Sequence, residues 1–176
     1  MREDISNKST LNTTKGNNKQ MIEEPIIKGY VTVIKNVGRP DEQILCENKP
    51  NLLTNGGRDW MIAQVYTNTS AGTRGSGYIA LTSNTASPAA GDTALTAEIT
   101  TGGLARADAT TKSHTGGTNS TTIQHTFTAS ATHTAVQKSG LFNASSGVTL
   151  SHENTFTAVT LQSSDTLQVT WTTTLG

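Results

Sequence analysis

The sequence predicts an all-β fold, mainly an antiparallel β-sandwich of jelly-roll-like type, with one short α-helix and an extended N-terminal arm. Residues 165–174 alternate along a strand, so that Leu167, Val169 and Trp171 share one face and threonines fill most of the other. Threonine makes up 33 of the 176 residues, and β-branched residues pack well on sheets. Strand-like segments also recur every ~8–12 residues with turn signals between them, as in sandwiches and barrels.

The composition indicates a thin core and neutral polar outer faces. Apolar residues make up 33% of the chain and charged residues 15%, whereas disordered chains combine low hydrophobicity with high net charge. Little apolar surface is available for burial, so part of the stability is expected to come from contacts between subunits. The formal net charge of zero argues against binding nucleic acid, which requires a positive footprint. No segment approaches the ~20 apolar residues of a membrane span, so we expect no membrane association.

We divide the chain into an arm, residues 1–24, and a sandwich domain, residues 25–176. The arm is too polar to order itself, and we expect it to lie on a neighbouring subunit. An alternative is that it consists of tag and vector residues. The side chains that we expect to attach the protein are Ile5, Leu11, Met21, Ile22, Ile26, Ile27 and Tyr30.

The first half of the domain combines strands with helical patterns. Residues 26–47 read as a β-hairpin, with turn residues at 38–41 and a break at 48–51. Residues 58–66 have helical spacing, with Thr54 or Asn55 as the cap. Residues 77–82 form a compact strand, and residues 92–99 have the pattern of one or two helical turns capped by Asp92.

The second half reads as a series of strands. They are expected at 104–113, 121–129, 136–143, 148–153, 156–161 and 165–174, with a turn at Gly116 and Gly117. The side chains predicted to form the domain core are Trp60, Ile79, Leu81, Ile123, Phe127, Leu141, Phe142, Leu167, Val169 and Trp171.

Several phrases within residues 52–176, in their order and spacing, resemble a family of small virion proteins of tailed bacteriophages and related viruses. They are LTNGGRDW at 53–60, YIALT at 78–82, AAGDTAL at 89–95, GLARA at 103–107, SGLFNA at 139–144 and DTLQVTW at 165–171. The resemblance implies a structural component attached to the head or tail of a virus particle, and it implies no reaction. The arm and the hairpin at 25–51 lie outside it, so residues 52–176 are the family-like core.

No group of residues has the spacing of a catalytic or metal site. The histidines, at 114, 125, 133 and 152, are unpaired in sequence, and His125 reads as a partly buried strand residue. Carboxylates in the domain are scattered, with no acid–base pair. Cys46 has no histidine partner nearby and is interpreted as a small buried hydrophobe on a strand. The sequence therefore predicts neither an enzyme nor a cofactor or metal site.

The predicted function is that of a non-enzymatic virion protein, a capsid decoration or tail-associated subunit assembled in the host cytoplasm. Its expected partners are other copies of itself and a major capsid or tail protein. An alternative is a tail-fibre or head-fibre module that binds host glycans through the polar loops at 67–76, 83–91 and 112–119. A polysaccharide hydrolase is a third and weaker hypothesis.

Overall fold

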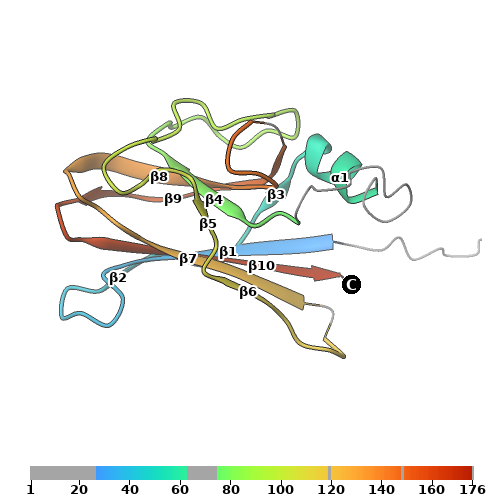
Figure 1. Cartoon of the computed structure of the whole chain (residues 1–176), viewed down its shortest axis with the longest axis horizontal. Helices are drawn as coiled ribbons and strands as arrows, with labels where there is room; N and C mark the ends of the chain where they lie inside the picture. The colour runs from blue at the N-terminus through green and yellow to red at the C-terminus, as the bar shows by residue number, and fades with distance from the viewer. Residues whose placement is uncertain (1–26, 63–74, 119, 148, 176) are drawn as a thin grey trace, which may run out of the picture.

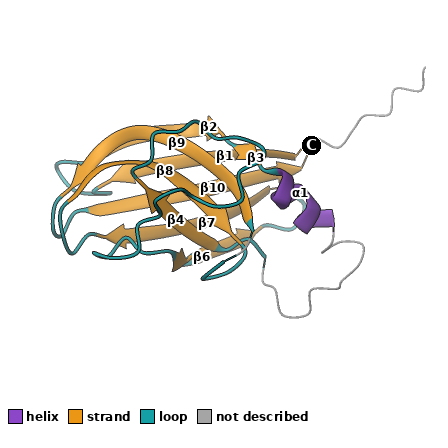
Figure 2. Ribbon diagram, turned by 90° about the horizontal axis from the view of Figure 1, so that it is seen from above, coloured by secondary structure: helices purple, strands orange, loops and turns teal. Residues whose placement is uncertain are grey.

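A computed structural model describes residues 27–62, 75–118, 120–147 and 149–175; for Trp60, Ile62 and Leu175 only the backbone is described. Two five-stranded antiparallel sheets face each other, with a short helix at one end (Figures 1 and 2). The predicted all-β sandwich with one short helix is confirmed. The predicted arm, residues 1–24, lies outside the described residues.

Sheet A has the strand order β2-β1-β10-β7-β6. Its strands are β1 (Ile27–Lys35), β2 (Gln43–Pro50), β6 (Thr111–His114), β7 (Ser120–Thr128) and β10 (Thr166–Leu175). The threonine-rich C-terminal strand β10 lies in the middle and pairs along nine positions with β1 and along nine with β7. The expected hairpin is present as β1 and β2, although β2 continues to Pro50 instead of ending at Glu47.

Sheet B has the strand order β3-β9-β8-β4-β5. Its strands are β3 (Leu52–Leu53), β4 (Tyr78–Thr82), β5 (Ala107–Asp108), β8 (His133–Phe142) and β9 (Leu150–Leu161). The two strands predicted at 148–153 and 156–161 are one strand, β9. The polar residues between them continue the strand. The side-chain amide of Asn154 is buried there, and it donates a hydrogen bond to the Pro50 carbonyl at 2.6 Å, which satisfies it.

Residues 104–113 do not form the single predicted strand. Their alternating pattern is divided between β5, which pairs with β4 in sheet B, and β6, which pairs with β7 in sheet A. The buried Ala109 lies between them, and its N–H donates to the Gly77 carbonyl at 2.7 Å. The chain therefore crosses from one sheet to the other here, which an alternating pattern alone does not reveal.

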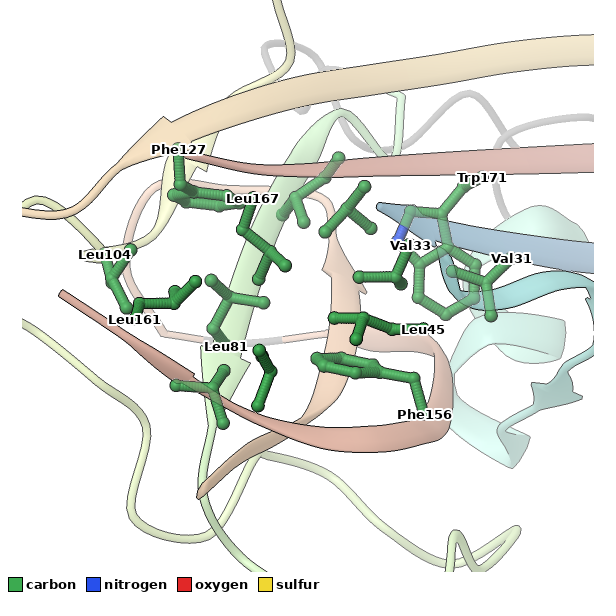
Figure 3. Packing of buried hydrophobic residues seen from close by; sticks show 14 of the residues in the cluster. Val31, Val33, Leu45, Leu81, Leu104, Phe127, Phe156, Leu161, Leu167 and Trp171 are labelled. Atoms are coloured by element: carbon green, nitrogen blue, oxygen red, sulfur yellow. The ribbon is translucent and has the colours of Figure 1, made fainter. Parts of the chain in front are cut away.

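The side chains between the sheets form one continuous core (Figure 3). Sheet A contributes Val31, Val33, Leu45, Phe127, Leu167, Val169 and Trp171, and sheet B contributes Ile79, Leu81, Val136, Leu141, Phe156, Val159 and Leu161. Nine of the ten predicted core residues can be assessed. Eight are buried, and Ile123 is half-buried against the cluster. The Trp60 side chain lies outside the description.

Phe142 is buried on the other side of sheet B. It packs with Ala80, Leu95 and Leu150 in a second, smaller cluster. Because Leu141 and Phe142 are consecutive on a strand, they point to opposite faces. Leu141 is buried between the sheets, and Phe142 is buried because residues 83–104 run across the outer face of sheet B (Figure 1).

Helix α1 (Asn55–Ile62) begins three residues before the predicted start at Arg58. Thr54 is the cap: its Oγ1 accepts the Gly57 N–H at 3.0 Å and donates to the Leu150 carbonyl. The two glycines lie inside the helix, although glycine disfavours helix formation. Gly57 is needed because a Cβ there would lie 2.5 Å from the Ser151 carbonyl oxygen, so α1 packs directly against β9. Residues 63–66 of the predicted helix lie outside the described residues.

The helical turns predicted at 92–99 are absent. Residue Glu98 instead forms a β-bridge with Thr82, whose hydroxyl also donates toward the carbonyls of Thr96 and Ala97 at 2.8 and 2.9 Å. Asp92 closes a turn by accepting the Ala89 N–H at 3.1 Å. An isolated helix of two turns is marginal in water, so these tertiary hydrogen bonds decide the conformation.

Candidate assembly surface

Hydroxyl and amide side chains line the outer face of sheet A. Leu167, Val169 and Trp171 of β10 point into the core, so the residues that alternate with them point outward. The residues of β1 and β7 that pair with these outward residues point the same way. The outer face of sheet A is defined here by Lys28, Tyr30, Thr32 and Ile34 on β1, Thr166, Gln168, Thr170, Thr172 and Thr174 on β10, and Ser120, Thr122, Gln124, Thr126 and Thr128 on β7.

The polar side chains on this face bond to one another across the strands. Gln124 donates to the Thr170 hydroxyl at 2.8 Å, and Gln168 donates to the Thr126 hydroxyl at 3.3 Å. Cross-strand pairs of this kind contribute ~0.2–1 kcal/mol each. They also hold neighbouring side chains in fixed positions, which lowers the entropy cost of covering the face with a partner.

The outer face of sheet A carries very little charge. Along β1, β10 and β7, the one formal charge among the outward positions is Lys28, at the end of the face. In Figure 1, the loop between β4 and β5 crosses sheet B, whereas no described segment crosses the outer side of sheet A. This surface is therefore open, neutral and hydrogen-bonding within the described part of the molecule.

Apolar side chains lie at the β1–β2 margin of this face. Ile44 on the edge strand β2 is 57% exposed and is paired with Ile34 of β1. Val37 in the hairpin turn is also exposed. Ile27 at the start of β1 is exposed too, but it alternates with the outward positions of that strand. An uncovered edge strand with exposed apolar side chains is a common site of pairing with another chain.

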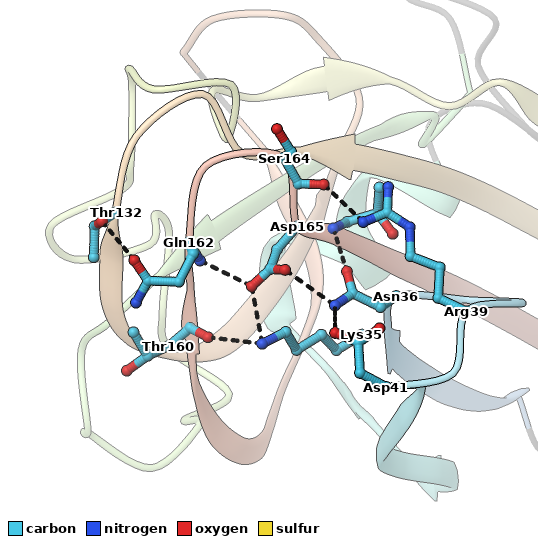
Figure 4. A network of polar contacts seen from close by, with 10 residues as sticks. Lys35, Asn36, Arg39, Asp41, Thr132, Thr160, Gln162, Ser164 and Asp165 are labelled. Atoms are coloured by element: carbon cyan, nitrogen blue, oxygen red, sulfur yellow. Dashed lines mark hydrogen bonds and ion pairs between the residues drawn. The ribbon is translucent and has the colours of Figure 1, made fainter.

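A polar network fixes the β1–β2 hairpin to the rest of the sandwich (Figure 4). Lys35 lies 2.9 Å from the Asp165 carboxylate, and Asn36 donates to the same carboxylate at 3.0 Å. Asn36 also accepts the Thr166 N–H at 2.7 Å, and Arg39 donates to the Ser164 carbonyl at 2.9 Å. The Gln162 N–H, Lys35 and Asn36 together hold the pKa of Asp165 down, at about 2. The turn that carries Val37 is thus held in place.

A second polar cluster lies on the outer face of sheet B, beneath the β4–β5 loop. Glu153 is 1% exposed, accepts the Ala89 N–H at 2.9 Å and lies 3.6 Å from Lys138 Nζ. Burial and a hydrogen bond with the Asp92 carboxyl raise the pKa of Glu153 to about 7, whereas the same hydrogen bond lowers the pKa of Asp92. This cluster holds the loop on the sheet. This cluster could not be recognised from local sequence patterns, because its members are distant in the chain.

The four histidines occupy separate places. The His125 ring packs edge-on against Phe127 with centroids 4.6 Å apart, and its pKa is lowered by burial, as expected for a partly buried strand residue. His133 contacts the Gly102 carbonyl at 3.1 Å, and His114 contacts the Ser120 carbonyl at 2.9 Å. His152 is buried between the sheets near Trp171. Within the described ranges, no three histidine, cysteine or carboxylate side chains gather in a way that would hold a metal ion.

Cys46 is half-buried on β2, and its thiol lies 3.6 Å from the Val31 carbonyl. Burial raises the pKa of the thiol, which keeps it protonated and unreactive. The predicted small buried hydrophobe therefore lies on a strand and packs against the core, but it is half-buried instead of buried.

The predicted attachment residues fall in two groups. Ile27 and Tyr30 belong to β1, where they pair with Leu175 and Thr172, so they are part of the sheet and not of a separate arm. Tyr30 points outward on the outer face of sheet A. The other five, at positions 5, 11, 21, 22 and 26, lie outside the described residues.

The loops suggested for glycan binding are described only in part. Ser76 of the first loop and Lys112 and Ser113 of the third line the same cavity. Residues 83–91 are held on sheet B through Glu153, whereas residues 111–114 are strand β6 at the edge of sheet A. Residues 67–74 lie outside the described ranges.

Comparison with protein-family models, with curated proteins and with solved structures finds no match to this chain. None of the helices in the described ranges is long and apolar enough to cross a bilayer.

Proposed function

We propose that this protein is a non-enzymatic structural subunit that assembles through the outer face of sheet A. The observation that carries the proposal is that no described segment covers this face, which is nearly uncharged and whose hydroxyl and amide groups bond to one another across β7 and β10. Copies of a surface with many like charges would repel each other, whereas a neutral one approaches a second copy without that cost.

The margin at β2 supports the same role. Ile34, Ile44 and Val37 add apolar contact area beside the polar face, and the network at Asp165 holds the residues on both sides of Val37, Asn36 and Arg39. A rigid, mixed surface loses little entropy when a partner covers it. The resemblance of residues 52–176 to small virion proteins suggests that the assembly is a virus particle, in which the protein decorates the capsid or joins the tail.

The test uses the full chain and a double substitution on the central strand, Thr170→Lys with Thr172→Lys. Light scattering after size exclusion should give an oligomer for the unaltered protein and a monomer for the variant, because lysines would place like charges on the contacting face. Thr157→Lys is the matched control, since Thr157 is an exposed strand residue of β9 in sheet B.

Co-sedimentation with virus particles made without the protein tests its place in the particle. The unaltered chain and the Thr157→Lys protein should bind these particles, and the double variant should not. A chain that stays monomeric and does not bind particles would overturn the proposal. Binding to host cell-surface polysaccharide instead would favour the glycan-binding alternative.

A further inference from the structure

A cavity of about 500 Å³ is lined by residues of both sheets and by Met61 of α1. Its apolar walls are Met61, Ile123 and Leu141, from α1, β7 and β8. The buried His152 of β9 also lines it. The volume lies within the range of ~300–1,000 Å³ that is usual for small-molecule sites.

The hydrogen bonds around His152 fix its tautomer. The Ser151 hydroxyl donates its single proton to the Leu141 carbonyl at 2.9 Å, and its oxygen accepts from the Ser76 hydroxyl at 2.9 Å. The 3.2 Å contact between His152 Nδ1 and the Ser151 oxygen must therefore be an N–H donated by the imidazole. It follows that Nδ1 carries the proton in the neutral ring, and that Nε2 is a bare acceptor.

This acceptor has no partner among the residues that the structure describes. His152 is 2% exposed, and its Nε2 makes no hydrogen bond to any described residue. Burial also lowers the pKa of the ring to about 4, so the ring stays neutral at physiological pH. Leaving a buried acceptor unpaired costs ~1–3 kcal/mol, which a donor placed in the cavity would recover.

The rest of the lining argues against a charged occupant. The Lys112 ammonium at the cavity is engaged by the Asp108 carboxylate, and the Ser113, Thr121 and Thr173 side chains add only hydroxyls. The lining contains no carboxylate among the described residues, so a cation would find no partner. Its basic side chains are Lys112, which the Asp108 carboxylate engages, and His114, whose Nδ1 lies 2.9 Å from the Ser120 carbonyl, so an anion would find no unpaired ammonium group there. The apolar walls require an apolar body on the ligand.

We propose that this cavity binds a small, uncharged, mainly apolar molecule bearing a hydroxyl group, which donates a hydrogen bond to His152 Nε2. The class includes phenols and hydrophobic alcohols. The proposal concerns the interior of the sandwich and is independent of assembly through the outer face of sheet A.

Titration of the full chain with p-cresol and with toluene tests the proposal, because the two probes differ only in the hydroxyl. Calorimetry should show p-cresol binding about 10-fold more tightly than toluene, as expected for one hydrogen bond to a buried acceptor. The ¹⁵N resonance of His152 Nε2 should be that of an unprotonated nitrogen in the free protein, and it should move when p-cresol is added.

Two variants give separate readouts. His152→Phe removes the acceptor and should abolish the preference for p-cresol over toluene. Thr121→Trp places a bulky side chain at an exposed position of the lining and should weaken both probes, without disturbing the core. Thr157→Lys, on the outer side of the molecule, should change neither affinity.

Three results would overturn the proposal. They are the absence of p-cresol binding up to its solubility limit, equal affinity of the unaltered protein for both probes, and an Nε2 resonance typical of a protonated nitrogen. The first would mean that the cavity holds only water, and the second that the hydroxyl plays no part in recognition. If His152→Phe does not fold, the two-probe comparison and the ¹⁵N measurement on the unaltered chain still decide the matter.

Discussion

Two consecutive buried polar residues, His152 and Glu153, occupy opposite faces of β9. His152 points inward, with its ring centroid 6.2 Å from that of Trp171, and Glu153 points outward under the β4–β5 loop. Burial affects both by the same mechanism, since it disfavours the charged form, so it lowers the pKa of the histidine and raises that of the glutamic acid. Their effects on stability as a function of pH therefore have opposite signs.

The folded protein retains the Glu153 proton up to a pKa of about 7, against an ordinary value of 4.5. Between pH 4.5 and 7, the unfolded chain binds fewer protons at this residue than the folded protein does. The contribution of Glu153 to stability is therefore complete below pH 4.5 and is lost as the pH rises to 7. For His152, with a pKa of about 4 against 6.5, the unfolded chain binds more protons, and stability is lost as the pH falls from 6.5 to 4. Between pH 4.5 and 6.5 the two effects oppose each other.

We therefore predict that Glu153→Gln makes the protein increasingly more stable than the unaltered chain as the pH rises from 4.5 to 7. The gain approaches about 3 kcal/mol, because the amide need not lose a proton under the loop. Urea unfolding at several pH values measures it. A stability difference between the two proteins that does not change with pH would contradict the assignment of the raised pKa to Glu153.

At the scale of the element, helix α1 depends on its contact with β9. Gly57 faces the backbone of Ser151, where an added Cβ would lie 2.5 Å from the carbonyl oxygen and 2.9 Å from Cα. Neither backbone atom can move without shifting the strand. Gly56, one residue earlier, points elsewhere: a Cβ there would lie 3.6 Å from Thr149 Cγ2, an ordinary contact.

This difference predicts opposite effects of one substitution at adjacent positions. Gly57→Ala should lower the free energy of unfolding by about 1–3 kcal/mol, because the helix must move off the sheet. Gly56→Ala should leave stability unchanged or raise it by up to about 1 kcal/mol, because alanine favours the helix. Thermal or urea unfolding measures both. Equal effects at the two positions would show that α1 does not pack as described.

At the scale of the whole molecule, the β1–β2 hairpin is a central part of the sandwich. It lies outside the phrases that resemble virion proteins, yet β1 pairs with β10 over its full length and contributes Val31 and Val33 to the core. The described core contains no residue before Val31. The sandwich therefore needs the residues of β1.

Deleting residues 2–24 should leave a folded domain whose free energy of unfolding changes by less than about 0.5 kcal/mol, the range of changes away from a core. The same deletion should abolish binding to particles made without the protein, if this segment is the attachment arm. Circular dichroism and co-sedimentation measure the two properties. Loss of folding would show that the arm belongs to the domain, and retained binding would show that attachment depends on the sandwich alone.

The strand pattern of the sequence was sufficient to predict the sandwich because a period of two is a local property. Leu167, Val169 and Trp171 alternate with threonines, and burial of one face follows wherever that strand is placed. The same reasoning located the hairpin, the turn at Gly117 and eight buried core residues. The predicted helix at 92–99 was wrong because the capping pattern of Asp92 is also local, and tertiary bonds to Thr82 outweighed it.

The tertiary structure alone decided which polar residues are buried and what they face. His152, Glu153 and Lys138 read as ordinary strand residues, since their burial arises from a loop and an opposite sheet that are distant in the chain. The division of residues 104–113 between two sheets has the same origin. Local alternation determines that a residue points to one side of its strand. What lies on that side, whether core, cavity, loop or open surface, depends on long-range packing that no short segment encodes.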